Sequence, residues 1–345
     1  MQKTGSFDGA KVVKLRDIAE AAGVTIATAS RSLNGSYGVH RLTRERVVQA
    51  AARLNYRPNR LARSLVTGRS HILGLILSDI RNPFFAEVAR GAEDTAYTAG
   101  CDVVLCNSDL DSEKQRHYID SLMGKSVDGI IMNSVRALDE AEQRRLAASG
   151  VPVVLLNSSA KKTPFSTVSA DNQRGGRLAA EYLIALGHRR LAHLSGPRHH
   201  GNLTQRAKGF LQAVREASKD ATVRMLHGGH TLDGGYAMAR KLFRERPDIT
   251  AIFAGNDALA FGVLKAAHEC GVRIPHDVSL IGFDNVEFAT IVHPPLTTIH
   301  QAKYEMGEAA VSILLRLAKG KDRNPEDRVL GVELIERDSA MKVNR

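Results

Sequence analysis

The feature that most restricts the fold is a regular alternation of strand-like and helix-like segments between residues 71 and 283. Short apolar runs recur at 71–77, 101–106, 127–132, 151–156, 190–194, 222–226, 249–254 and 278–283. Amphipathic stretches such as 86–99 and 175–186 separate them. Strands that alternate with helices predict parallel sheets covered by helices on both faces. About 25 to 30 residues per strand–helix unit predict two doubly wound halves that face each other across a ligand cleft.

Residues 15–35 have a different pattern, typical of two short helices joined by a tight turn. Apolar residues follow helical spacing at Leu15, Ile18, Ala19 and Ala22. Gly23 is expected to end this helix, and Thr25 is placed to cap a second one, with Ala29 and Leu33 on its inner face. These segments predict a helix-turn-helix, although a plain helical hairpin of an all-α domain would have the same pattern.

If the second helix lies in a DNA major groove, the side chains near its start reach base edges and phosphates. The candidates are Thr25, Ile26, Ala27, Ser30, Arg31 and Asn34. The charge distribution supports this reading, because residues 1–70 contain 13 Lys and Arg against 4 Asp and Glu, which is +9 of the net +11. A head that binds a polyanion, attached to a nearly neutral body, is the natural interpretation.

A third helix and a linker are expected next. Thr43 is placed to cap the helix, whose buried stripe would be Val47, Ala50, Ala51 and Leu54. Pro58 disfavours helix at the residue before it, and Asn59 can cap a shorter helix over 60–66 that ends at Gly68. Fewer than two turns of isolated helix are unstable in water. The segment is therefore either a plain linker or a hinge that orders on DNA.

Several classes of site are not supported by the sequence. Cys101, Cys106 and Cys270 are odd in number and form no C-x-x-C pair, so we expect small buried thiols in a reducing compartment. The four histidines between 188 and 200 fit no compact zinc set. We find no dinucleotide-binding, Walker or nucleophile-elbow motif. We therefore expect no metal, no cofactor and no enzymatic activity. Because residues 1–14 lack an apolar signal segment and no run approaches ~18 apolar residues, we expect a cytoplasmic protein without membrane contact.

From about residue 14 to 339 the chain resembles the lac repressor/galactose repressor family of bacterial transcription regulators. The order and spacing of the matching motifs carry the resemblance more than any one of them does. They are LRDIAEAAGVTIATASRSLNG (15–35), LNYRPNRLARSL (54–65), NPFF (82–85), VSADN (168–172), LGHRRLAHLSGP (186–197), Arg206-x-x-Gly209-Phe210, AIFAGNDALAFG (251–262), IPHDVSLIGFDN (274–285) and PPLTTIHQ (294–301).

The resemblance implies a role for the linker. In the family, the hinge helices of two subunits pair and push a leucine into the minor groove, and the matching residue is Leu65. Arg60 and Arg63 of the same helix then join the DNA-binding residues. With Ile26 and Ala27 at the two main base-reading positions, thymine methyl groups and groove shape are expected to matter more than bidentate hydrogen bonds.

Chemistry and resemblance together indicate which residues of the body bind a small effector. Asp284 ends a strand where a carboxylate can accept hydroxyl or N–H donors, and Arg206 offers a planar fork of donors. Asn157 stands where the family often has an aspartate, which leaves the donor pattern of the ligand open. Asn256 is favoured over its neighbour because an aspartate at a helix start is often only a cap. The remaining expected contacts are Phe84, Phe85, His230 and Gln301.

These observations predict an all-α helix-turn-helix head and hinge helix followed by an α/β, two-lobed body like a periplasmic binding protein, with parallel doubly wound sheets. The expected divisions are a basic arm (1–14), the helix-turn-helix domain (15–58), the hinge (59–68) and an effector-binding and dimerisation body (69–345). Its first lobe would comprise about 69–169 and 302–326, and its second about 170–301 and 327–341.

The expected function is a repressor, homodimeric on a pseudopalindromic operator and therefore associated with the nucleoid. Its operator affinity would be controlled by a sugar, a sugar phosphate or a nucleobase-like effector. Two rival classes fit less well. A periplasmic solute-binding protein would need a signal peptide and would lack the basic head, and an α/β enzyme would need a nucleophile–base pair or a cofactor loop.

Overall fold

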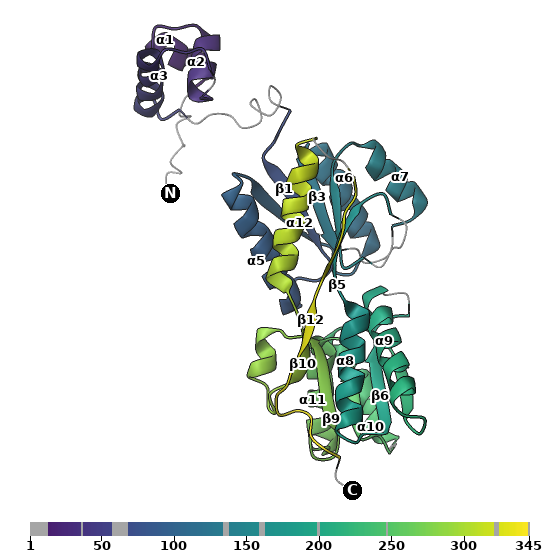
Figure 1. Ribbon diagram of the computed structural model, residues 1–345. Helices are drawn as coiled ribbons and strands as arrows, with labels where there is room; N and C mark the ends of the chain where they lie inside the picture. Colours follow the sequence, from purple (N-terminus) through teal and green to yellow (C-terminus); the bar gives the residue numbers. More distant parts are fainter. Residues whose placement is uncertain are drawn as a thin grey trace, which may run out of the picture. The chain divides into compact units, whose positions relative to one another are not determined.

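The computed structural model describes residues 13–35, 37–56, 68–133, 138–158, 163–198, 201–245, 248–320 and 324–343. The chain divides into two compact units, residues 1–70 and 71–345 (Figure 1). The expected hinge residues Arg60, Arg63 and Leu65 lie outside the described residues.

The first unit is built from α1 (Leu15–Ala21), α2 (Ile26–Leu33) and α3 (Arg41–Arg53). Gly23 turns the chain between the first two helices at φ +64°, a conformation that glycine adopts without strain. Thr25 caps α2 as predicted, because its Oγ1 accepts the Thr28 N–H at 3.2 Å. The small core consists of Ile18, Ala19, Ala22, Ala29, Val47, Ala50 and Ala51.

One prediction for this unit is wrong. The third helix begins at Arg41 and is capped by His40, whose Nδ1 accepts the Leu42 N–H at 3.4 Å. Thr43 therefore lies inside the first turn of α3 and is not the cap. Ser, Thr, Asp and Asn dominate at the N-cap position, which is why the residue types alone favour Thr43 over His40.

The second unit contains two lobes, each with a six-stranded sheet. In the first lobe the strand order is β11-β5-β4-β3-β1-β2, and every pairing is parallel. The strands are β1 (Ile72–Leu77), β2 (Asp102–Asn107), β3 (Gly129–Asn133), β4 (Val153–Leu156), β5 (Ser166–Ala170) and β11 (Asp327–Leu330). The helices of this lobe are α5 (Pro83–Thr98), α6 (Ser112–Gly124), α7 (Glu140–Ala148) and α12 (Lys303–Ala318).

The second lobe repeats this plan with the strand order β12-β10-β9-β8-β6-β7. Its strands are β6 (Arg190–Ser195), β7 (Thr222–His227), β8 (Ala251–Ala254), β9 (Ser279–Asp284), β10 (Thr297–Gln301) and β12 (Val332–Ile335). Only the pairing of β12 with β10 is antiparallel. The helices are α8 (Asn172–Ala185), α9 (Gly201–Ala217), α10 (Leu232–Arg244) and α11 (Asp257–Cys270), and a short 3-10 helix covers Glu287–Thr290.

Two buried hydrophobic clusters in each lobe cover the two faces of its sheet. Burial on both faces explains why the central strands are continuously apolar, since neither side of such a strand meets water. The eight strands expected from apolar runs are all present, with ends shifted by one or two residues. Four of the described strands lie outside these runs. β5, with the sequence STVSA, and β10, with TTIHQ, were not expected, and the single last strand expected near Arg328 to Arg337 is divided into β11 and β12.

The chain passes between the lobes three times, after β5, after β10 and between β11 and β12 (Figure 1). The last passage corrects one expected boundary. Residues 327–330 were assigned to the second lobe, but β11 pairs with β5 in the first sheet, so the passage falls at Gly331. A short apolar segment is compatible with either sheet, and only the hydrogen-bond partner decides between them.

Two of the three cysteines and His188 are buried within the fold. Cys101 and Cys106 are buried as expected, whereas Cys270, the last residue of α11, is exposed, which corrects the expectation for that residue. His188 bridges Thr250 Oγ1 and the Met341 carbonyl oxygen at 3.0 Å each. Within the described part of the chain, no three His, Cys, Asp or Glu residues are grouped closely enough to hold a metal ion. No described helix is both long and apolar enough to span a membrane.

Candidate effector cleft and DNA-reading helix

The start of α2 is accessible in the way a base-reading helix requires. Thr25, Ala27, Arg31 and Asn34 are exposed, and 46% of the Ile26 surface is accessible. Ser30 is half-buried, and its Oγ lies 3.4 Å from the Asn34 amide nitrogen, which fixes these two side chains to each other. The expected DNA-facing residues of this helix therefore share its outer side, opposite the buried Ala29 and Ser32.

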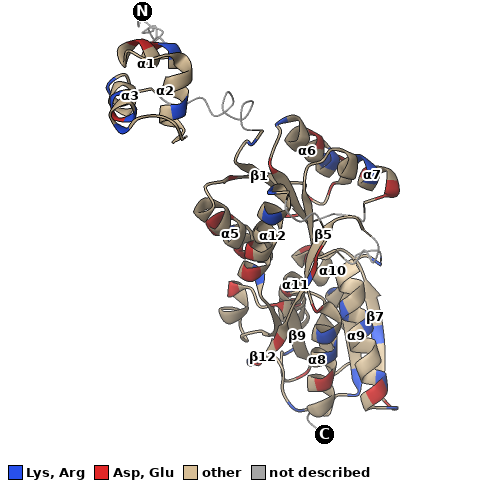
Figure 2. Ribbon diagram, turned by 45° about the horizontal axis from the view of Figure 1, so that its top comes forward, with Lys and Arg blue, Asp and Glu red and all other residues tan. Residues whose placement is uncertain are grey.

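Basic residues lie along all three helices of the first unit (Figure 2). Two acids within its described residues act locally. Asp17 accepts the backbone N–H of Lys14 at 2.7 Å, and Glu45 lies 3.7 Å from Arg41. The exposed Arg31 makes no ion pair among the described residues. The surface thus keeps the positive charge that the sequence predicts, in the form that attracts a phosphate backbone.

In the second unit, a cavity of about 430 Å³ lies at the carboxyl ends of the strands, between the two lobes. Its size is in the range usual for small-molecule sites. All eight residues expected to contact the effector line it: Phe84, Phe85, Asn157, Arg206, His230, Asn256, Asp284 and Gln301. They come from both lobes and from the ends of β4, β9 and β10.

Arg206 and Asp284 form a buried pair at the centre of this site. The Arg206 Nη1 lies 3.4 Å from Asp284 Oδ1, and both side chains are 5% exposed. Nη1 also donates to the Gly255 carbonyl oxygen at 2.6 Å, and Nε donates to Asn172 Oδ1 at 2.8 Å. The guanidinium carbon lies 3.6 Å from the centre of the Phe283 ring. Arg206 is thus held in place by hydrogen bonds and ion pairing with Asn172, Gly255 and Asp284 and by the Phe283 ring.

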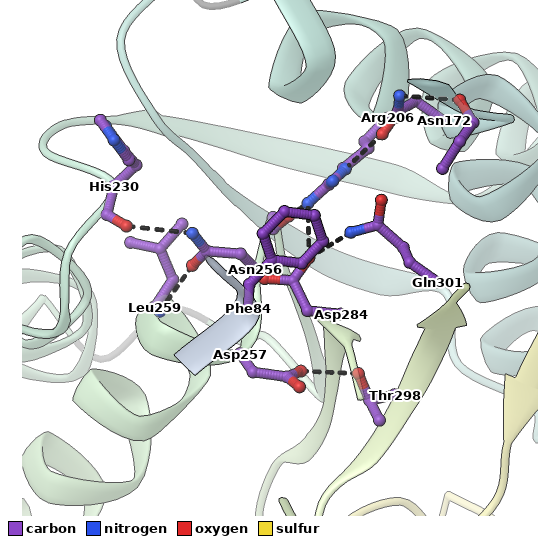
Figure 3. Close-up of polar contacts among 12 residues, drawn as sticks. Phe84, Asn172, Arg206, His230, Asn256, Asp257, Leu259, Asp284, Thr298 and Gln301 are labelled. Atoms are coloured by element: carbon purple, nitrogen blue, oxygen red, sulfur yellow. Dashed lines mark hydrogen bonds and ion pairs between the residues drawn. The ribbon is translucent and has the colours of Figure 1, made fainter. Parts of the chain in front are cut away.

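The Asp284 carboxylate is held just as firmly. Gln301 Nε2 donates to its Oδ1 at 2.5 Å, and Figure 3 shows Arg206 and Gln301 pointing toward it. The backbone of Asp284 has φ +125°, a strained conformation for a residue with a side chain, of the kind that concentrates at functional sites. Lys303, at the start of α12, donates to the carbonyl oxygens of Asp284 and Asn285 at 2.9 Å each and so holds the strained turn.

Burial shifts the protonation equilibria of this cluster. Loss of hydration raises the pKa of Asp284 to about 7, although the Arg206 charge acts in the opposite direction. Burial likewise lowers the pKa of Lys303 and raises that of Asp257. Asp257 is not a cavity residue, because its carboxylate accepts Thr298 Oγ1 at 2.6 Å and the Val286 N–H at 2.9 Å. It joins β10 to the start of α11.

Asn157 and Gln301 each present an acceptor without a hydrogen-bond partner among the described residues. The atoms are Asn157 Oδ1 and Gln301 Oε1, and both are buried. Asn157 follows β4 with φ +52°, a left-handed conformation that asparagine tolerates better than most residues. A buried acceptor without a donor is unfavourable by about 1 to 3 kcal/mol, so these two oxygens favour a ligand that supplies donors.

The NPFF segment places two aromatic rings at the cavity. Asn82 caps α5 by accepting the Phe84 N–H at 3.0 Å, and Pro83 occupies the first helical position, where its missing N–H is harmless. The rings of Phe84 and Phe85 meet edge to face, with centroids 5.1 Å apart and planes at 86°. Both side chains are largely buried, and both line the cavity.

Asn256 lines the cavity, but both polar atoms of its side-chain amide already make hydrogen bonds within the protein. Its Oδ1 accepts the Leu259 N–H at 2.8 Å as the cap of α11, and its Nδ2 donates to the His230 carbonyl oxygen at 3.0 Å. The reasoning that preferred Asn256 over Asp257 because the aspartate would be the cap is therefore wrong, since the asparagine is the cap. The His230 ring lies beside the cavity, and burial lowers its pKa.

Several cavity residues were not predicted from the sequence. Asp79 and Arg81 follow β1 and are joined by two side-chain hydrogen bonds of 2.8 and 2.9 Å. Asn133 ends β3 and accepts Ser78 Oγ at 2.6 Å. Asn202 lies near the start of α9. Their positions could have identified them, because each is a polar residue at the carboxyl end of a strand or at a helix start on that edge of the sheet, where such folds bind ligands.

Comparison with known proteins agrees with this architecture. The model for bacterial regulatory proteins of the lacI family matches residues 14–59, and that for a periplasmic binding protein-like domain matches residues 180–340. The catabolite control protein A of Priestia megaterium is 36% identical over 308 residues, which is 88% of this chain and 92% of that protein. The chain belongs to the lacI family.

Further relatives cover nearly the whole chain. The transcriptional repressor PurR of Vibrio vulnificus is 35% identical over 333 residues, 96% of this chain and 99% of that protein. The structure of a lac repressor dimer bound to operator and an anti-inducer superposes with a TM-score of 0.85 at 30% identity, covering 96% of this chain and all of that one. As a lacI-family member, the chain is a DNA-binding transcription regulator with a ligand-binding body.

Proposed function

We propose that this protein is a homodimeric, cytoplasmic repressor that binds a pseudopalindromic operator and releases or tightens it in response to a small effector in the cleft. The carrying observation is the buried Arg206–Asp284 pair, which is tied to two of the segments that cross between the lobes, through Asn172 after β5 and through Gln301 at the end of β10. Gln301 ends β10 and Lys303 starts α12, so a ligand that touches Asp284 acts directly on a crossing segment.

The DNA-binding part of the proposal uses two regions. Ile26, Ala27 and Arg31 would read the major groove from the exposed start of α2, with Thr25, Ser30 and Asn34 beside them. Leu65 would be wedged between base steps at the operator centre, with Arg60 and Arg63 on phosphates. Dimerisation supports specificity, because one short recognition helix contacts too few base pairs and two-fold symmetry doubles the site.

The effector would act by closing the lobes, which changes the relative position of the two first-lobe surfaces in the dimer and hence whether the hinge segments can pair. Such coupling between sites is typically about 1 to 3 kcal/mol and is reciprocal. The effector classes compatible with the fold are a sugar, a sugar phosphate and a nucleobase-like ring. The named relatives support a range of effectors, since a catabolite control protein, the repressor PurR and a lac repressor all occur among them.

The test combines operator selection with an effector screen. An operator is first selected from random duplexes with the purified full chain, and fluorescence anisotropy then measures its affinity with and without each compound of a sugar, sugar phosphate and purine panel. We expect one compound class to change operator affinity by roughly 5- to 150-fold. In the Asp284→Asn and Arg206→Lys variants, operator affinity without effector is expected to stay close to that of the wild type while the response is lost.

Arg273→Lys provides the matched control. Arg273 also pairs with an aspartate, Asp277, at 2.6 Å, but this pair is on the surface. A wild-type response in that variant together with a lost response in the two cleft variants supports the proposal. If the cleft variants respond to the compound as the wild type does, the effector does not bind at this pair and the proposal is wrong.

A further inference from the structure

The charged lining of the cleft contains more carboxylates than cations. The described lining residues include two arginines, Arg81 and Arg206, against Asp79, Asp233 and Asp284. The cations could each attract an anionic ligand if they were free. Their neighbours therefore decide whether the cleft admits a phosphate. The inference below rests on the proposed function, because it concerns the ligand of the same cleft.

Arg81 is neutralised within its own loop. Its backbone N–H and its Nε both donate to Asp79 Oδ1, at 3.0 and 2.8 Å, and its Nη2 donates to Asp79 Oδ2 at 2.9 Å. The Asp79 side chain is 9% exposed, while that of Arg81 is 71% exposed. Asp109 and Asp233 lie close enough to add to the raised pKa of Arg81. Arg81 thus lines the cleft with its charge already compensated.

Arg206 is compensated in the same way at the base of the cleft. Asp284 lies 3.4 Å from its Nη1, and the Gly255 carbonyl oxygen occupies the other direction of that nitrogen. A second anion here would meet one cation shared with a buried carboxylate. Like charges at short range inside a poorly hydrated site repel strongly, so a phosphate group is disfavoured.

The hydrogen-bonding groups without partners require donors from the ligand. Asn157 Oδ1 and Gln301 Oε1 are buried acceptors without a partner among the described residues, and the Asp284 carboxylate also accepts. They are carried by different segments, after β4, at the end of β10 and at the end of β9. A ring with hydroxyl groups on successive carbons supplies donors in several directions, whereas a planar base supplies them only in its own plane.

The arrangement of the aromatic residues also favours a non-planar ring over a flat base. Phe84 and Phe85 are set at 86° to each other, so they do not form a parallel slot between which a flat base would stack. The edge of one phenyl ring and the face of the other can instead pack against the C–H groups of a puckered ring.

We propose that the cleft selects a neutral, hydroxyl-rich ring such as an unphosphorylated sugar, and that Asp79 is a specificity residue that excludes phosphorylated ligands by neutralising Arg81. Asp233 adds to the exclusion from the opposite lobe, at the start of α10.

The test compares matched pairs of ligands by calorimetry on the purified full chain. The pairs are D-ribose with ribose 5-phosphate, D-glucose with glucose 6-phosphate, and D-fructose with fructose 6-phosphate, and hypoxanthine is included as a planar base. Only binding that is lost in the Arg206→Lys variant is counted as binding in the cleft. We expect the neutral member of at least one pair to bind roughly tenfold or more tightly than its phosphate.

Asp79→Asn then tests the mechanism of selection. Removing this carboxylate charge leaves Arg81 without its main counter-charge, so we expect the preference for the neutral sugar to shrink by roughly tenfold, mainly through tighter phosphate binding. The control is Asp277→Asn, which removes the same charge from a surface Arg–Asp pair and should leave the preference unchanged. If Asp79→Asn does not fold, Asp233→Asn replaces it and should shift the preference in the same direction by a smaller factor.

A phosphate or hypoxanthine that binds more tightly than every neutral sugar overturns the inference, as does a panel in which no neutral sugar binds. An unchanged preference in both aspartate variants overturns the role given to Asp79. These outcomes are separate from failure of the proposed function. A phosphorylated ligand that binds in the cleft and alters operator affinity leaves the proposed function intact. A neutral sugar that binds selectively but does not alter operator affinity leaves the inference intact.

Discussion

The charged side chains of the cleft are held in place by other protein groups. Arg206 has three protein partners, and Asp284 is fixed by Gln301 and by the Lys303 contacts to its turn. A buried ion pair of this kind contributes little net stability, because the cost of removing both charges from water opposes the attraction between them. Its value is pre-organisation, since groups already ordered lose little entropy when the ligand binds.

Asp284 makes folding stability depend on pH near neutrality. Burial raises its pKa to about 7 in the folded chain, above the ordinary value of 3.8. A raised folded pKa means that the native state binds the proton more tightly, so this stabilisation is present at low pH and is lost as pH rises through about 7. The neighbouring charges that set this balance are Arg206, Asp257 and Lys303.

The corresponding measurement is the difference in melting temperature between the wild type and Asp284→Asn, followed from pH 5 to 8. We expect the wild type to lose stability relative to the variant as pH rises. Buried histidines contribute equally to both proteins and cancel. Asp277→Asn is the control, because Arg273 holds the pKa of Asp277 at about 2, outside the window. A constant difference across the range would show that Asp284 does not titrate there.

At the scale of elements, two helices of the second lobe approach closely through glycines. A Cβ on Gly176 of α8 would collide with the carbonyl oxygen of Arg206 on α9, and one on Gly209 would collide with the carbonyl oxygen of Gln173. Arg206 therefore reaches the cleft because α9 can lie directly against α8. The Arg206-x-x-Gly209-Phe210 step combines a residue that lines the cleft with the glycine that permits this approach and with the buried Phe210.

Gly176→Ala should destabilise the second lobe by about 1 to 3 kcal/mol, the usual effect of overpacking, and should weaken ligand binding because α9 must shift. Chemical denaturation and calorimetry measure the two effects. The matched variant is Gly124→Ala, at the last position of α6, where an added Cβ meets nothing within 4 Å. A Gly176→Ala protein as stable as Gly124→Ala would contradict the packing argument.

The hinge is a second prediction at this scale. Leu65→Ala should weaken binding to the selected operator far more than binding to random duplex DNA, because only the specific complex is expected to kink around the leucine. Titrations with both duplexes at one salt concentration measure the two affinities. Equal losses on both would remove the hinge assignment and leave residues 59–68 as a plain linker.

The net positive charge of the whole molecule is concentrated in its first unit. The first 70 residues carry +9 of the net +11, so operator affinity should fall steeply with salt, whereas ligand affinity in the cleft should change little. A plot of log affinity against log salt measures both, and a flat line for DNA would exclude the charge argument. Reciprocity adds a second requirement: saturating operator must change effector affinity by the same factor by which effector changes operator affinity.

The sequence predicted the fold class and the helix-turn-helix from local signatures, namely the apolar period and a glycine turn. The eight cavity-lining candidates came from chemistry together with the family resemblance: Asp284 and Asn157 are polar residues after buried strands, whereas Arg206, Phe84 and Phe85 were identified by their place in matching motifs. Ser- and Thr-rich β5 and β10 were missed because a strand acquires its stability from neighbours in the sheet and not from its own composition. The last lobe boundary was misplaced because only strand pairing assigns β11.

What each cavity residue does was decided by tertiary structure. The sequence could not reveal that Asn256 is consumed as a helix cap, that Lys303 holds the strained turn after β9, or that Asp79 compensates Arg81. A side chain's role depends on which donors and acceptors remain unpaired after folding. Which donors and acceptors remain unpaired is decided only when segments far apart in the sequence have been brought to the same edge of two facing sheets.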